Sequence, residues 1–290
     1  MAELRKFPGG NWGRYFGFPV FLAVFLLAGA CRRSGETVQV RQSQAGETGT
    51  GQSAATAPAG DRYDELISTA NWAGKFTVFF LDLAVSPEAK DKSGDATLLI
   101  SPEGKVMMLD SGHPESAGDI LSFLSDLGIG RIDYFILSHP HIDHIGGFPA
   151  VAERHQVGEA YQIDMEYNTD TYRRYRDALE KRHIPVTNLK RGDTFGFGGE
   201  ISVEVFNPGE KIEPPGFPAD STQFINNSSL VLKFNYGDSS LLMGGDIYTP
   251  RERELIDLYG EKLRADVVKA NHHGGDTSNS SRWIRTTGPR

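Results

Sequence analysis

Four residues with metal-binding side chains fall within six positions of the chain, in the segment ILSHPHIDHIGG at 136–147. His139 and His141 stand two apart after an apolar stretch, so in an extended chain both side chains point to one side. That places two imidazole nitrogens near one cation. Asp143 and His144 follow where the chain must turn, and they offer a carboxylate and a third imidazole to a second cation. Packing is a poor explanation for such a density of ligands, so the segment predicts a two-metal site.

The composition limits what else such a site can contain. Cys31 is the only cysteine, which excludes a disulfide within the chain and a thiolate-rich zinc site. Histidines and carboxylates must therefore hold the metal. The formal net charge is −8, and no broad basic stretch of the kind that grips nucleic acid phosphates is present. This charge argues against tight DNA binding but leaves a nuclease open, because bound cations supply local positive charge.

The ligand-rich segment needs strands and helices to hold it. Apolar patterns predict strands over 76–83, 96–101, 105–110, 132–137, 201–206, 229–235, 239–243 and 266–270, and helices over 116–127, 170–183 and 249–259. Strands come first and then alternate with helices, which favours a layered α/β fold with helices outside packed sheets. For the last helix, Thr249 is the expected N-cap and Pro250 the first residue.

The N-terminal region has the order of a secretory signal. Basic residues precede an apolar run at 15–30, which ends in small residues directly before Cys31. We therefore expect a signal peptide or lipoprotein signal over 1–31, a flexible linker over 32–62 and a folded domain over 63–290. This order predicts export, either as a secreted or periplasmic protein or as a lipoprotein anchored to the membrane at Cys31. An uncleaved anchor is the remaining alternative, and no protein partner is expected.

The segment at 136–147 resembles the His-x-His-x-Asp-His motif of the metallo-β-lactamase superfamily. Two further stretches resemble elements of that family. Asp110-Ser111-Gly112 looks like its Asp-x-Gly element, whose aspartate supports the ligand loop from behind the metal ligands. Gly244-Gly245-Asp246 looks like its Gly-Asp element, whose aspartate bridges both metals. The resemblance implies an αββα sandwich over 63–290, shortened at its C-terminal end.

A last similar stretch, NHHGG at 271–275, resembles the family's His-His-Gly element, which completes the second metal site. The resemblance implies two ligand sets: His139, His141 and Asp246 for the first metal, and Asp143, His144, Asp246 and His273 for the second. Asp143 and His272 are the expected catalytic residues, with His272 contacting the substrate or protonating the leaving group. Which of His272 and His273 binds the metal stays open. Two divalent ions are implied, zinc as the first expectation and manganese as the alternative.

Within the superfamily, residues 76–281 resemble the hydrolase domain of bacterial competence DNA-uptake channel proteins. The stretches that carry this resemblance are FLDL, SHPHIDHIGG, NNSSLVLKFNYGDSSLLMGGD and DVVKANHHGG. Phosphorylcholine esterases are similar around the paired histidines. Both resemblances imply that a hydroxide activated by two metals attacks a phosphate ester of a small molecule or a nucleic acid. Hydrolysis of an amide, lactone or thioester is the second interpretation, and a non-catalytic metal-binding surface lipoprotein is the third.

Some features depart from the family pattern. An insertion precedes Gly94-Asp95-Ala96, where the competence proteins have a Gly-Gln-Gly-Asp element. The third histidine that many members give to the first metal is not evident, and neither His155 nor His183 is assigned to it. Asn227 and Ser229 could contact the substrate, but an asparagine-rich turn that satisfies its own backbone is the favoured explanation.

Overall fold

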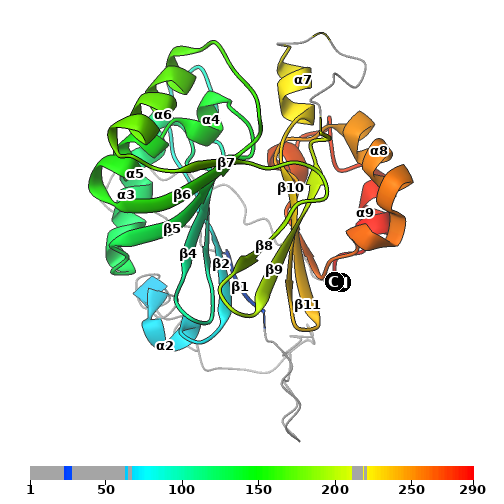
Figure 1. The fold of residues 1–290 in the computed structure, drawn as a ribbon, viewed down its shortest axis with the longest axis horizontal. Coiled ribbons are helices and arrows are strands. Elements are labelled where there is room, and N and C mark those ends of the chain that lie inside the picture. Colours follow the sequence, from blue (N-terminus) through cyan, green and yellow to red (C-terminus); the bar gives the residue numbers. More distant parts are fainter. Residues whose placement is uncertain (1–22, 28–62, 65–66, 211–217, 219–220) are drawn as a thin grey trace, which may run out of the picture.

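The computed structural model describes residues 23–27, 63–64, 67–210, 218 and 221–290. These residues form two β-sheets that face each other, with helices outside each sheet (Figure 1). Apart from 23–27, the predicted signal over 1–31 and linker over 32–62 lie outside the described residues, Cys31 included. Export and lipid anchoring therefore stay predictions. In the described part of the chain, no helix has the length and apolar character needed to cross a membrane.

The first sheet changes from antiparallel to parallel pairing at its middle strand, β4. Its strands, in spatial order, are β1 (Ala23–Leu27), β2 (Phe76–Phe80), β3 (Thr97–Ile100), β4 (Val106–Leu109), β5 (Arg131–Ile136), β6 (Gln156–Gln162) and β7 (Val186–Asn188). Neighbours from β1 to β4 are antiparallel, and neighbours from β4 to β7 are parallel. The residues that follow β4 and β5 therefore meet at one edge of the sheet, which is where α/β folds place ligands.

The second sheet brings the later part of the chain to the same centre. Its spatial order is β12 (Val267–Val268), β11 (Ser239–Met243), β10 (Val231–Tyr236), β9 (Ile201–Asn207) and β8 (Thr194–Phe197). The pairs from β8 to β11 are antiparallel, whereas β12 lies parallel to β11. The chain segments that follow β11 and β12 consequently leave the sheet at the same edge.

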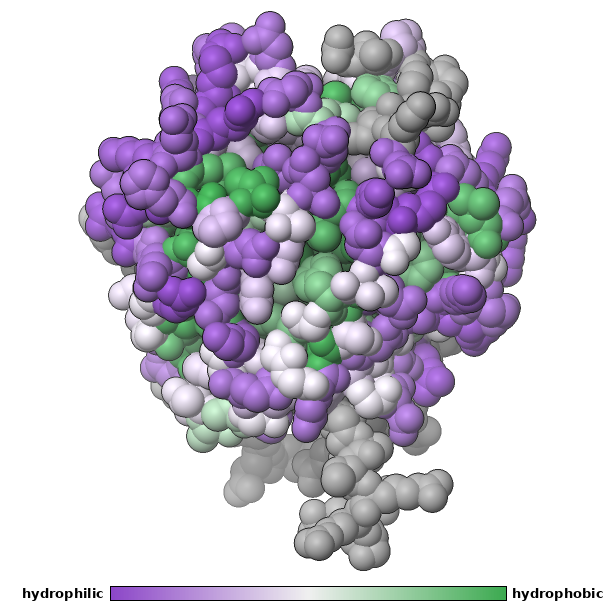
Figure 2. Space-filling model, viewed as in Figure 1, coloured by the Kyte–Doolittle hydropathy of each residue, from purple (hydrophilic) through white to green (hydrophobic). Residues whose placement is uncertain are grey.

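Helices cover the outer face of each sheet. Over the first sheet lie α3 (Ala117–Asp126), α4 (Ile142–Ile145), α5 (Phe148–Arg154) and α6 (Asp170–Lys181), and over the second lie α8 (Thr249–Tyr259) and α9 (Ser281–Thr287). The described residues also include two short α-helices, α2 (Thr69–Trp72) and α7 (Thr222–Asn227), and three 3-10 helices, η1 (Pro114–Ser116), η2 (Gly260–Leu263) and η3 (Asn271–Gly274). In the face shown by Figure 2, the surface over α6 and α8 is mostly hydrophilic, as expected of helices that bury one stripe only.

Three buried apolar layers hold these elements together. One joins the first sheet to its helices around Phe135, and a second lies between the sheets around Phe76. The third joins the second sheet to α8 and α9 around Trp283, which is fully buried. Burial of each such aromatic side chain contributes about 1.5–3 kcal/mol. The layering confirms the αββα sandwich, with α8 and α9 packed on the outer face of the second sheet.

The predicted elements are found, with differences at their ends. Strands β6, β7 and β8 were not predicted, because their polar, exposed or half-exposed residues give no apolar run. Helices α2, α4, α5, α7 and α9 were not predicted either, and β1 lies within the stretch expected to be a signal. The prediction of Thr249 as the N-cap of α8 was wrong. Tyr248 is the N-cap, and the Thr249 hydroxyl instead donates to the backbone oxygen of Thr277 at 3.1 Å. The helix is thereby tied to the loop that follows the paired histidines.

Candidate metal centre

Asp110 supports the loop that carries His139, His141, Asp143 and His144, which we call the ligand loop. Asp110 follows β4, beside Ser138, which follows the neighbouring parallel strand β5. Asp110 Oδ1 accepts the backbone N–H of Ser138 at 2.8 Å, and Oδ2 accepts the Ser138 hydroxyl at 2.6 Å and pairs with His144 Nδ1 at 2.8 Å. Pairing through Nδ1 leaves Nε2 of His144 free to face a metal. The structure thus places Asp110 where a supporting aspartate is needed.

His139 and His141 present two nitrogens at the separation that one cation needs. His139 Nε2 lies 3.0 Å from His141 Nδ1, close to the separation of about 3.3 Å that two nitrogens have around a tetrahedral zinc ion. Burial lowers the pKa of both rings, and nearby His144 lowers them further; for His141 the pKa falls to about 4. Both imidazoles are therefore neutral at pH 7, which is the form that binds a metal.

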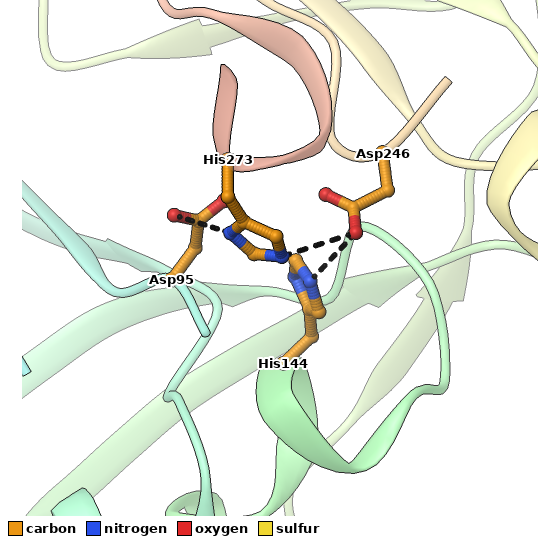
Figure 3. Close-up of side chains that lie close together, drawn as sticks. All are labelled: Asp95, His144, Asp246 and His273. Carbon is orange, nitrogen blue, oxygen red and sulfur yellow. Dashed lines mark ion pairs between the residues drawn. The ribbon is translucent and has the colours of Figure 1, made fainter. Parts of the chain in front are cut away.

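Asp246 lies between the two groups of histidines. Its Oδ2 is 3.9 Å from His139 Nε2. The same oxygen is 3.3 Å from His144 Nε2 and 3.2 Å from His273 Nε2 (Figure 3). Asp246 comes directly after β11 and its glycine pair, and its backbone N–H donates to Ser229 Oγ at 3.1 Å. One carboxylate oxygen thus reaches ligands from both expected metal sites, as a bridging ligand must.

The second group of ligands combines the ligand loop with the turn that follows β12. His273 Nε2 lies 3.4 Å from Asp143 Oδ2. Asp95, His144, Asp246 and His273 each offer a ligand atom, and these four atoms lie within 4.8 Å of one another. The structure therefore brings together residues that lie more than a hundred positions apart in the chain.

Asp95 was not predicted as a site residue. Its Oδ1 lies 3.2 Å from His273 Nδ1, and its Oδ2 lies 2.5 Å from Lys269 Nζ. Because both carboxylate oxygens have partners, Asp95 orients His273 as Asp110 orients His144. The signal in the sequence was Gly94-Asp95-Ala96, which the resemblance had associated with a family element without giving it a role.

The two neighbouring histidines differ in their surroundings, and this favours His273 as the ligand. His272 Nε2 lies 3.9 Å from Asp246 Oδ2, at the edge of the centre. Its Nδ1 lies 2.6 Å from Thr277 Oγ1, and its ring lies 4.9 Å from that of Tyr248. Both histidines have positive φ angles, 49° and 53°, so a tight turn directs the two side chains differently.

The charges of the second group are strongly coupled. Burial lowers the pKa of His273, but hydrogen bonds to Asp143, Asp246 and Asp95 outweigh it and raise the pKa to about 11. Burial likewise opposes the charge on His144, and the carboxylates around it, Asp246 first, raise its pKa well above the ordinary value. Burial also disfavours charge on Asp246, yet His144 and His273 hold its pKa well below the usual range. Without a metal, protonated histidines compensate these carboxylates.

Buried ligand atoms that lack a well-aligned hydrogen bond indicate that the residues fit a metal. Among the described residues, His144 Nε2, His273 Nε2 and Asp246 Oδ1 are buried and make no hydrogen bond of good geometry. Buried polar atoms almost always have partners. A divalent cation bound by these side chains would give them the partners that they lack. Histidine nitrogens and carboxylate oxygens are suitable ligands for zinc, and the oxygens also suit manganese.

The other residues considered in the sequence lie outside the ligand sets. His155 directly follows α5, and His183 is exposed two residues after α6. Asn227 Oδ1 accepts the backbone N–H of Tyr248 and its Nδ2 donates to the backbone oxygen of Gln223. Both ends of the amide therefore have backbone partners, one within the segment and one at Tyr248. The segment is the short helix α7 rather than a turn.

Residues 90–286 match the metallo-beta-lactamase superfamily. The chain therefore belongs to this superfamily of metal-dependent hydrolases.

Among curated proteins, the chain is similar to ComE operon protein 3 of Bacillus subtilis, with 29% identity over 61% of this chain and 22% of the relative. It is 27% identical to competence protein ComA of Neisseria gonorrhoeae, over 69% of this chain and 25% of that protein. Endoribonuclease ysh1 of Aspergillus fumigatus is 24% identical over 66% of this chain and 23% of its own length. The chain thus spans about a quarter of the length of these relatives.

Proposed function

We propose that this protein hydrolyses phosphate esters, as a phosphodiesterase or nuclease-like enzyme, with two divalent cations. The observation that carries the proposal is the position of Asp246 Oδ2 between His139 on one side and His144 and His273 on the other. When bound, two such cations lower the pKa of a water molecule and neutralise charge on phosphate oxygens. The similarity to competence proteins and to a protein named as an endoribonuclease supports the choice of phosphate esters.

In this proposal most of the site residues are metal ligands and one, His272, is a proton donor. His139, His141 and Asp246 would hold the first cation, and Asp143, His144, Asp246 and His273 the second. Protonated His272 would donate its Nδ1–H to Thr277 and present Nε2–H to the leaving oxygen. Burial, with the charge of His273, lowers the pKa of His272 even though Asp246 opposes this shift. A lower pKa makes the imidazolium a better proton donor.

We also propose that the protein is exported and acts outside the cytoplasm, with a lipid on Cys31 as its anchor to the membrane. Support comes from the order of basic, apolar and small residues before Cys31. Labelling with a radioactive fatty acid in a bacterial host tests this: wild type takes up label, and Cys31→Ser does not. Label-free wild type found in the medium would favour simple secretion.

Hydrolysis of bis-p-nitrophenyl phosphate by the metal-loaded protein tests the proposed reaction. We expect turnover by wild type, and its loss in His141→Ala and Asp246→Asn. His272→Ala should keep its metal and lose roughly 10²–10⁴-fold in kcat, the usual contribution of a general acid. Metal-loaded wild type that cleaves lactone or thioester substrates but no phosphodiester would overturn the phosphate-ester proposal in favour of carbonyl hydrolysis. A loaded protein inert to all of these substrates would indicate a binding role.

A further inference from the structure

A largely buried lysine that neither ligand set uses lies beside the metal centre. Lys269 follows β12, and its Nζ lies 2.5 Å from Asp95 Oδ2 and 3.3 Å from the backbone oxygen of Ala270. Only 12% of the Lys269 side chain and 17% of the Asp95 side chain are exposed. Burial of two charges costs free energy that their attraction often does not recover. Fold stability alone is therefore a weak explanation for this pair.

The second oxygen of Asp95 connects the pair to a metal ligand. Asp95 Oδ1 lies 3.2 Å from His273 Nδ1, while Nε2 of the same ring faces Asp143 and Asp246. A metal-binding histidine commonly donates its other ring N–H to a carboxylate, which fixes the tautomer and the ring orientation. Lys269, Asp95 and His273 therefore form one chain of contacts that ends at the second metal position.

The backbone of Asp95 is already held against the ligand loop. Its N–H donates to the backbone oxygen of Asp143 at 3.2 Å, and its own oxygen accepts from the N–H of Gly112 at 2.9 Å. At Gly94, with φ +75°, a Cβ atom would lie 1.6 Å from the Asp143 oxygen, so only glycine allows this approach. With the backbone fixed, rotation of the carboxylate is the freedom that remains, and Lys269 restricts it.

We propose that Lys269 is a positioning residue for the second metal: it holds the Asp95 carboxylate so that Asp95 accepts the Nδ1–H of His273 and leaves Nε2 as the ligand. This inference rests on the two-metal site proposed above. A cation at this place has one other role to consider, namely charge balance among the carboxylates of the metal-free protein. The two roles predict opposite changes in metal affinity when Lys269 is removed. A positioning lysine strengthens metal binding, so its removal would weaken it. A lysine that only balances charge competes with the metal, so its removal would tighten metal binding.

Zinc titration of the metal-free protein distinguishes the two roles without any activity measurement. His144→Ala lacks a ligand of the second site and identifies which binding step belongs to it. In Lys269→Met we expect that step to weaken by about 10–100-fold, the usual effect of losing an outer partner of a ligand, while the first step is unchanged. Lys233→Met is the matched control, because Lys233 is a partly buried lysine of β10 whose Nζ donates to the backbone oxygen of Lys262. It should titrate as wild type.

The double variant Lys269→Met/Asp95→Asn guards against misfolding, since it leaves no unpaired carboxylate. In this double variant, zinc binding to the second site should weaken as much as in Lys269→Met, because either change breaks the same chain of contacts. A second step that is unchanged or tighter in Lys269→Met, or in the double variant, would overturn the proposal while leaving the two-metal site intact. Wild type that takes up no second zinc ion would instead overturn the two-metal site, and this inference with it.

Discussion

At the scale of single residues, the metal-free centre contains two kinds of histidine. Some of them are neutral and the others are protonated until a metal binds. Burial lowers the pKa of His139 and His141. Carboxylates overcome the effect of burial at His144 and His273, and the pKa of His273 reaches about 11. A ligand must lose its proton before it can bind. The two metal sites should therefore differ in their dependence on pH.

We expect metal uptake at the second site to release protons and to strengthen as the pH rises towards about 11, the pKa of His273. Below its folded-state pKa, His273 holds a proton that the metal must displace, which costs about tenfold in affinity per pH unit for each proton released. Calorimetric titrations at pH 7.5 in buffers of different ionisation enthalpy measure this release. His273→Ala should release fewer protons than wild type. Equal release by both proteins would contradict the assigned pKa.

The residues that could be found in the sequence are those grouped by short spacing. A metal site was predicted from the spacing of His139, His141, Asp143 and His144 alone. The pairing of Asp95 with Lys269 could not be recognised, because the two residues lie 174 positions apart. Their pairing depends on how the loop before β3 lies across the ligand loop. A short sequence pattern does not predict which loops meet in space.

At the scale of elements, the turn with the paired histidines is held by a buried carboxylate of α8. Glu252 is fully buried. It accepts from Asn271 Nδ2 at 2.9 Å and from the backbone N–H groups of Asn279 and Ser280 at 2.5 and 2.9 Å. These bonds fix both the start of the turn and the start of α9. The helix thus helps to determine where His272 and His273 lie.

Glu252→Ala should destabilise the fold by about 3 kcal/mol or more, because it leaves several buried donors without an acceptor. We also expect weaker metal binding at the second site, since the turn is released. Urea unfolding and zinc titration check the two effects. Glu261→Ala is the matched control: its ion pair with Arg264 is exposed, so its loss should change stability by less than about 0.5 kcal/mol. Equal effects of the two substitutions would contradict this account of α8.

Elements with strong apolar periodicity were predicted correctly, and elements with mixed patterns were not. The hairpin of β3 and β4 and the helix α6 lie where the patterns placed them. Strand β6 was missed because its QVGEAYQ sequence alternates weakly between half-buried and buried positions. It forms as a strand because β5 and β7 pair with it on either side. The fold class followed from the long patterns, whereas β6 depends on its neighbours.

At the scale of the whole molecule, the two sheets share one metal centre. His139, His141 and His144 follow strand β5 of the first sheet, whereas Asp246 and His273 follow strands of the second. A cation bound by both groups joins the two halves of the sandwich. Metal binding should therefore stabilise the folded domain as one unit.

Addition of zinc at roughly 100 times its Kd to the chelator-treated protein should add about 2.7 kcal/mol of stability. For a domain of this size that corresponds to a rise in Tm of roughly 5–10 °C. We expect a single transition with and without metal, because the metal joins both sheets and the apolar layer between them is continuous. Differential scanning calorimetry makes the measurement. Two separate transitions, with metal shifting only one of them, would show that the halves are not joined in this way.

The most direct test of the two-metal centre is the number of metal ions that each chain holds. Elemental analysis of the purified protein, loaded and then freed of excess metal, should give two ions per wild-type chain. It should give one in His141→Ala, which lacks a ligand of the first site, and one in His273→Ala, which lacks a ligand of the second. A single ion in wild type, or two ions retained in both variants, would contradict the ligand sets assigned around Asp246.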